Sequence, residues 1–83
     1  MTLEQIFEMY PDEEFLKADG FDDAVIGVEP NSMRLVYDRD RMVEILVEEG
    51  MTYEDSIEYL EFNTFCAYVG EKTPLYIYVR DTE

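Results

Sequence analysis

The fold is decided by residues 24–38, which read AVIGVEPNSMRLVYD. Residues 24–29 are rich in β-branched side chains, which is typical of a β-strand, and we predict a second strand over residues 33–37. Between them lies Pro-Asn-Ser, three residues that favour turns. Because so short a connection joins antiparallel neighbours, the stretch predicts a β-hairpin.

Two helices are predicted after the hairpin, over residues 39–49 and 53–68. Asp38 and Thr52 each stand directly before one of them, where a side-chain oxygen can accept a hydrogen bond from a free N–H group of the first turn. Asp55 strengthens the second of these caps. A glycine follows each helix and is expected to end it: Gly50 and Gly70.

The clearest alternation of side chains follows, in residues 75–79, LYIYV. Side chains on a strand point to opposite faces in turn, so this stretch predicts a third strand. We expect one set of side chains to face the core: Leu75, Ile77 and Val79. The opposite face is then expected to carry the two tyrosines, Tyr76 and Tyr78.

Two short helices are expected before the hairpin. Thr2 and Gln5 fit a capping box, which predicts a helix over residues 3–9. Pro11 is suited to a first helical turn, and the acidic residues after it favour the positive end of a helix dipole. The sequence therefore predicts a second helix that starts at Pro11 and is closed by Gly20.

These elements predict one α+β domain over residues 1–83, in the order α-α-β-β-α-α-β. Its centre is expected to be a small three-stranded, mainly antiparallel sheet with helices packed on one face. Three strands are near the minimum for an independently stable sheet. The last strand is expected to pair with one strand of the hairpin.

Composition excludes several classes of site. The chain has no His and a single Cys, so His-based catalysis, a Cys-based zinc site and an internal disulfide are excluded. Cys66 has no neighbouring cationic cluster and is expected to be a buried thiol. We therefore expect a protein that is not an enzyme and that has neither a cofactor nor a metal site.

Charge is the most unusual property of the chain. It carries 21 acidic and 6 basic residues, for a net charge of −15. Such a surface repels nucleic-acid phosphates and anionic lipids, so direct binding to either is disfavoured. The first residues lack the basic and long apolar regions of a signal peptide, and with a free Cys this predicts a cytoplasmic protein.

The acidic residues of the two central helices are the candidate partner-binding site. At 100° per residue they fall on strips along each helix, and like charges four residues apart repel each other. No Lys interrupts them on the second helix, which suggests selection for binding as well as folding. A merely solvated face and general salt adaptation are the alternatives. The candidate residues are Glu44, Glu48, Glu54, Asp55, Glu58 and Glu61.

The second central helix also carries apolar residues on two sides. We expect Tyr53, Ile57 and Leu60 to lie opposite the acidic strip. Tyr59 and Phe62 lie on another side, where they are either buried or form an exposed patch that docks a partner. The tyrosines of the last strand pose the same question for the outer face of the sheet.

Several segments resemble a group of small acidic proteins encoded by tailed bacteriophages. They are DDAVIGV (22–28), LVYD (35–38) running into MVEIL (42–46), and EFN (61–63) followed by AYVGEKTP (67–74). The resemblance implies an intracellular protein made in an infected bacterium, and it implies no particular activity. In size and charge alone the chain is similar to phage inhibitors that mimic DNA, such as uracil-DNA glycosylase inhibitors.

Together these features predict a non-enzymatic inhibitor or modulator. Its helical carboxylates would stand in for phosphates and bind a basic surface on a host protein, one that itself binds nucleic acid. The alternative is a small structural or assembly protein that forms a homodimer through the tyrosine-bearing face of its sheet. The two differ in salt dependence, because salt screens contacts between charged surfaces.

Overall fold

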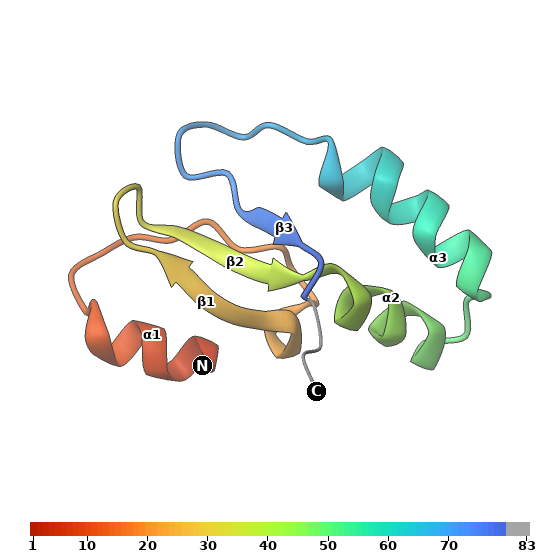
Figure 1. Cartoon of the computed structure of the whole chain (residues 1–83), viewed down its shortest axis with the longest axis horizontal. Coiled ribbons are helices and arrows are strands. Elements are labelled where there is room, and N and C mark those ends of the chain that lie inside the picture. The colour runs from red at the N-terminus through yellow and green to blue at the C-terminus, as the bar shows by residue number, and fades with distance from the viewer. Residues whose placement is uncertain (80–83) are drawn as a thin grey trace.

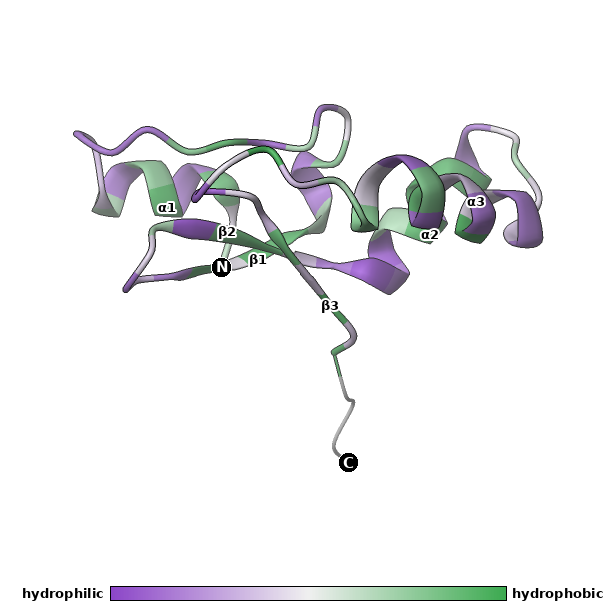
Figure 2. Cartoon of the chain, turned by 90° about the horizontal axis from the view of Figure 1, so that it is seen from above, coloured by the Kyte–Doolittle hydropathy of each residue, from purple (hydrophilic) through white to green (hydrophobic). Residues whose placement is uncertain are grey.

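The structure, a computed structural model, describes residues 1–79. This part of the chain forms an α+β fold in which the helices lie on one side of a three-stranded sheet (Figures 1 and 2). The elements follow in the order α1 (Leu3–Met9), η1 (Asp22–Ala24), β1 (Val25–Glu29), β2 (Arg34–Asp38), α2 (Arg39–Glu48), α3 (Tyr53–Leu60), η2 (Glu61–Phe65) and β3 (Leu75–Ile77). The predicted fold class is confirmed.

The predicted hairpin is confirmed, with β1 and β2 antiparallel. The register shifts between Val25 and Gly27, so one extra residue forms an irregularity in β1. At the turn, the Glu29 carboxylate accepts hydrogen bonds from the backbone N–H groups of Asn31 and Ser32, at 3.0 and 2.8 Å. The Ser32 hydroxyl donates to it as well, and these bonds lower the pKa of Glu29. The turn is thus held by the side chain of the last residue of β1.

The caps of the two central helices are also confirmed. The Asp38 side chain accepts from the N–H groups of Asp40 and Arg41 at the start of α2. The Thr52 hydroxyl accepts from Asp55 N at 3.1 Å at the start of α3. α2 ends one residue before the predicted boundary.

α3 is shorter than the predicted helix over residues 53–68. It ends at Leu60 and continues as a wider π-helical turn, η2, to Phe65. The Asn63 side chain donates to Tyr59 O at 3.0 Å and so competes with the backbone ladder. Phe65 also packs against Tyr76 of β3, with ring centres 5.3 Å apart. This tertiary contact favours the change from α-helical to π-helical geometry after Leu60.

β3 runs parallel to β2, which places β2 in the centre of the sheet (Figure 1). Tyr76 is opposite Tyr37, whose side chain is buried, and their ring centres are 5.6 Å apart. Tyr76 therefore shares the core face. Ile77, by alternation, lies on the other face and is 41% exposed.

The predicted orientation of the last strand is thus wrong: the side chains expected on the core face lie on the opposite face of the sheet. Leu75 and Ile77 do not face the core, and Val79 is exposed. Tyr78 is exposed, as expected. An alternating pattern gives the period of a strand, but a shift of one residue exchanges its two faces.

The predicted helix between Pro11 and Gly20 does not form. The chain makes a turn after Pro11 and then runs as an irregular segment, residues 13–18. Two of its backbone groups are bound by distant side chains. Ala18 N–H donates to the Tyr37 hydroxyl at 2.8 Å, and Glu14 O accepts from Lys72 Nζ at 2.6 Å. These bonds satisfy backbone groups that a helix would have paired internally.

The core lies between the sheet and the helices. Its largest fully buried side chain is that of Tyr37 at the centre of β2. α1 contributes Leu3 and Ile6, and its Thr2–Gln5 capping box is confirmed. Other core residues come from the sheet, from the helices and from the residue before η1: Phe21, Ala24, Val25, Leu35, Met42, Val43, Ile45, Leu46 and Leu60. The acidic side chains are consequently placed outside.

Candidate partner-binding surface

The six candidate carboxylates all belong to exposed residues on α2, on α3 or at the start of η2. The two helices pack against each other through their apolar sides. On α3, Ser56 is fully buried, and its hydroxyl donates to Thr52 O at 2.8 Å. The acidic side chains lie on the exposed sides of the two packed helices.

The carboxylates do not form one continuous strip. Glu44 and Glu48 of α2 line a groove of about 680 Å³ together with Asp40. A second groove, of about 430 Å³, lies along α3 and is lined by Asp55 and Glu58. The remaining two candidates, Glu54 and Glu61, line neither groove.

The α2 part of the site is partly neutralised. Arg41 Nη1 lies 3.2 Å from Glu44 Oε1 and 3.4 Å from Glu48 Oε1. The hydrogen bond to Glu44 and the charges of both carboxylates raise the pKa of Arg41. The spacing from Arg41 to these residues, three and seven positions, places all three on one helix face. Sequence reasoning missed this pairing although the spacing indicates it.

The α3 part of the site is not neutralised in this way. Among residues 1–79, no Lys or Arg forms an ion pair with its acidic side chains. These are Glu54, Asp55, Glu58 and Glu61.

Exposed aromatic side chains lie among these acidic residues. Phe62 is 80% exposed and Tyr59 is 47% exposed, and both line the α3 groove. Of the two readings of these residues, the exposed patch is therefore the one that the structure supports. Tyr53 is 63% exposed and lines the α2 groove, which corrects its expected place on the buried side of the helix. As the first residue of α3, Tyr53 lies beyond the reach of the core.

Cys66 is exposed, which corrects its expected burial. It follows η2, where the helix has already ended and the chain has left the core. Within the described part of the chain, no group of three or more His, Cys, Asp or Glu side chains is arranged to hold a metal ion. In the same residues, no helix has the length and apolar character needed to cross a membrane.

The arrangement offers recognition by charge and by aromatic contact. Exposed carboxylates attract a basic surface over a distance, and neighbouring aromatic rings supply apolar area at close range. Comparison with protein-family models, with curated proteins and with solved structures finds no significant match to this chain.

Proposed function

We propose that this chain is a non-enzymatic binding protein that binds a basic surface of a partner protein through its α3 surface. The α3 surface is the set of exposed acidic and aromatic side chains on α3 and at the start of η2: Glu54, Asp55, Glu58, Tyr59, Glu61 and Phe62. In its specific form, the proposal is an inhibitor or modulator in the cytoplasm of an infected bacterium. The partner is a host protein that binds nucleic acid, and carboxylates of the chain take the places of phosphates.

The observation that carries this proposal is the mixture of side chains on α3 and at the start of η2. The four acidic residues there make no ion pair within residues 1–79, and exposed Tyr59 and Phe62 lie beside them. Leaving like charges and large aromatic rings exposed together is unfavourable for a chain selected only to fold. A partner surface that has basic residues and apolar pockets would reduce the repulsion between the carboxylates and bury the aromatic rings.

A capture experiment tests the proposal. The full chain is immobilised and exposed to a bacterial lysate at about 50 mM and about 500 mM NaCl, with and without added double-stranded DNA. We expect a nucleic-acid-binding protein to be retained at low salt and released by either high salt or DNA. Retention that neither salt nor DNA weakens would contradict the proposal.

The reagent for mapping the site is a charge-neutral triple variant, Glu54→Gln, Glu58→Gln and Glu61→Gln. Gln keeps the helix propensity and nearly the same shape, so the change removes charge alone. The matched control is Glu4→Gln, Glu8→Gln and Asp12→Asn, which alters net charge by the same amount. Its three positions are exposed, and they belong to α1 and to the turn after it, a segment that lies across the molecule from α3 (Figure 1).

A second candidate function is homodimerisation through the open face of the sheet. The face is not the tyrosine-bearing one that the sequence suggests, because Tyr76 points into the core. It instead carries Val36, Leu75 and Ile77, which share one side by strand register. Sedimentation at low and high salt separates the two candidates. A dimer held by these apolar residues is expected to persist at high salt. The substitution Ile77→Asp is expected to dissociate it.

A further inference from the structure

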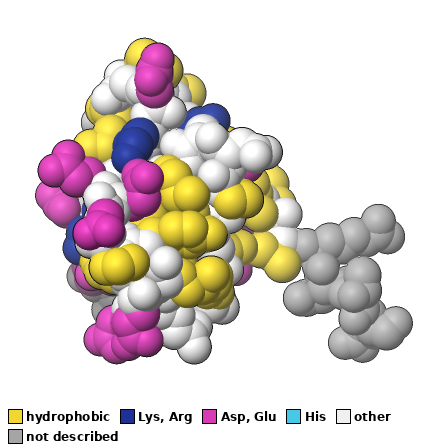
Figure 3. All heavy atoms as spheres, turned by 90° about the vertical axis from the view of Figure 1, so that its left-hand side faces the viewer, with side chains coloured by type: hydrophobic (Ala, Val, Ile, Leu, Met, Phe, Trp, Pro, Cys, Tyr) yellow, Lys and Arg dark blue, Asp and Glu magenta, His cyan; other side chains and the backbone are white. Residues whose placement is uncertain are grey.

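A groove lies at the end of the molecule opposite α3. It has a volume of about 690 Å³ and lies between α1, the segment after it and the loop before β3. Figure 3 views this end and shows hydrophobic side chains gathered there with Asp and Glu beside them. The groove is lined by three apolar residues, Phe7, Phe15 and Leu16, and by four charged ones, Glu13, Glu14, Glu71 and Lys72.

The apolar part of the groove is accessible. Phe7 is 43% exposed and Leu16 is 40% exposed. Phe7 and Phe15 are neighbours with ring centres 6.0 Å apart, so together they form an aromatic wall of the groove. Exposed apolar side chains gathered in a concave site are typical of ligand-binding and protein-binding surfaces.

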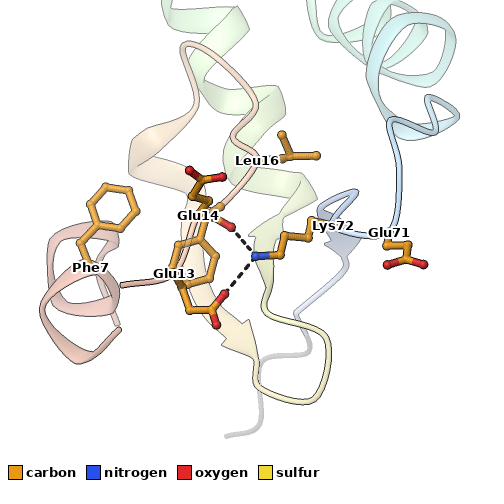
Figure 4. A pocket seen from close by; sticks show the side chains of 7 residues that line it. Phe7, Glu13, Glu14, Leu16, Glu71 and Lys72 are labelled. Carbon is orange, nitrogen blue, oxygen red and sulfur yellow. Dashed lines mark hydrogen bonds and ion pairs between the residues drawn. The ribbon is translucent and has the colours of Figure 1, made fainter. Parts of the chain in front are cut away.

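Lys72 bridges the groove and fixes its walls. Its Nζ donates to Glu13 Oε2 at 3.0 Å and to Glu14 O at 2.6 Å, and it lies 6.0 Å from the centre of the Phe15 ring. Figure 4 shows the lysine reaching from the loop before β3 to the segment that carries both glutamates. The two walls are therefore tied together before any ligand arrives, which lowers the entropy cost of binding.

The carboxylates of the groove outnumber its single cation. Lys72 pairs with Glu13, whereas the carboxylates of Glu14 and Glu71 make no ion pair within residues 1–79. A ligand that complements this charge carries a cation beside an apolar group. An anionic ligand such as a nucleic acid or an acidic lipid is disfavoured by the same charges.

We propose that this groove binds a peptide segment of a partner protein in which an aliphatic side chain stands next to Arg or Lys. The aliphatic side chain packs against the apolar lining formed by Phe7, Phe15 and Leu16, and the cation pairs with Glu14 or Glu71. This site is separate from the α3 surface and does not depend on the function proposed for it. It gives the protein a second contact surface with a different chemistry of recognition.

A titration of the full chain with short blocked peptides tests the proposal. The probe carries one leucine between two arginines, and the matched peptides replace either the leucine by glycine or both arginines by glutamine. Amide chemical shifts are followed by NMR. We expect the probe to shift residues 7, 13–16, 71 and 72, and each matched peptide to bind about tenfold more weakly. Binding that is unchanged without the leucine, or shifts confined to α2 and α3, would overturn the proposal.

Variants of the chain complete the test. Leu16→Ser and Glu71→Gln are each expected to weaken binding of the probe by about fivefold or more. Glu4→Gln makes the same chemical change as Glu71→Gln, and Val47→Ser makes a change comparable to Leu16→Ser; both positions are exposed and lie outside the groove, and both variants are expected to leave the affinity unchanged. All four positions are exposed, and thermal melts of each variant establish that it folds. Equal affinities for the groove variants and their controls would refute the site.

Discussion

The guanidinium carbon of Arg39 lies 4.2 Å from the centre of the Phe65 ring. Arg39 is the first residue of α2, and Phe65 is the last residue of η2. The same side chain donates from Nε to Tyr76 O at 3.1 Å and lies 5.2 Å from the centre of the Tyr78 ring. Arg39 therefore connects the start of α2 and the end of η2 to β3, and it holds the C-terminal end of the segment that carries the α3 surface against the sheet.

This arrangement predicts that Arg39→Gln destabilises the fold by about 1–2 kcal/mol, because it removes a cation–π contact and weakens the bond to the β3 backbone. Urea denaturation measures the change. Arg41→Gln removes the same charge from a surface pair with Glu44 and Glu48 and is expected to cost about 0.5 kcal/mol or less. If the two variants lose equal stability, Arg39 has no linking role.

Tyr37 predicts how stability depends on alkaline pH. Burial raises its pKa from 10.0 to about 12. Between these values the unfolded chain releases the proton while the folded protein keeps it. The free energy of unfolding is therefore undiminished below pH about 10 and falls by about 2 kcal/mol as pH rises toward 12.

Tyr37→Phe separates this titration from packing. The variant loses the hydrogen bond from Ala18 N–H and is expected to be less stable than wild type by about 1 kcal/mol at pH 7. It should also lose less stability than wild type between pH 9 and pH 11, as urea denaturation at each pH can show. A slope as steep as that of wild type would mean that other groups, such as Tyr76, cause the alkaline loss.

The two tyrosines of the C-terminal strand are predicted to respond oppositely to a charge. Tyr76→Asp places a carboxylate against Tyr37 and Phe65 on the core face, so we expect it to unfold the domain. Tyr78→Asp alters an exposed residue and is expected to leave a cooperative thermal transition. Circular dichroism melts decide between these outcomes. A folded Tyr76 variant would contradict the register of β3.

The net charge of −15 predicts a salt dependence of stability. Repulsion between surface carboxylates destabilises the compact state, and added salt screens it. We expect the melting temperature to rise by about 5 °C between 10 mM and 500 mM NaCl, and to rise less in the triple glutamine variant of α3. A melting temperature that does not change with salt would show that this repulsion is negligible.

Local signals account for the parts of the fold that could be predicted. Asp38, Thr2 and Thr52 are caps whose hydrogen bonds reach only two or three residues along the chain. The hairpin likewise depends on neighbours in sequence, and its turn is held by Glu29. Hydrogen bonds between residues two or three positions apart depend on short sequence motifs, so they can be predicted from the sequence.

The parts that could not be predicted depend on distant partners. Ala18 bonds Tyr37, nineteen residues away, and this bond replaces the helix expected after Pro11. Tyr76 faces the core because β3 pairs with β2 in one register out of two that its alternation allows. Phe62 is exposed because α3 ends early, at Leu60, and this end depends on contacts of Phe65. Tyr53 is exposed as the first residue of α3.

The candidate site was predictable to the same extent. Helical spacing places its six acidic residues on exposed surfaces, and all of them are exposed. Spacing within one helix does not reveal how two helices sit against each other. The placement of four of these carboxylates in two separate grooves, and the aromatic rings beside them, therefore emerge only from the three-dimensional structure.

The affinity of the captured partner for the triple variant Glu54→Gln, Glu58→Gln and Glu61→Gln is the most direct test of the α3 surface. We expect this variant to bind at least about tenfold more weakly than wild type at low salt, with most of the change in the association rate. The control variant at Glu4, Glu8 and Asp12 is expected to bind within about twofold of wild type. Equal losses in the two variants, or no loss in the first, would contradict a role for these carboxylates in recognition.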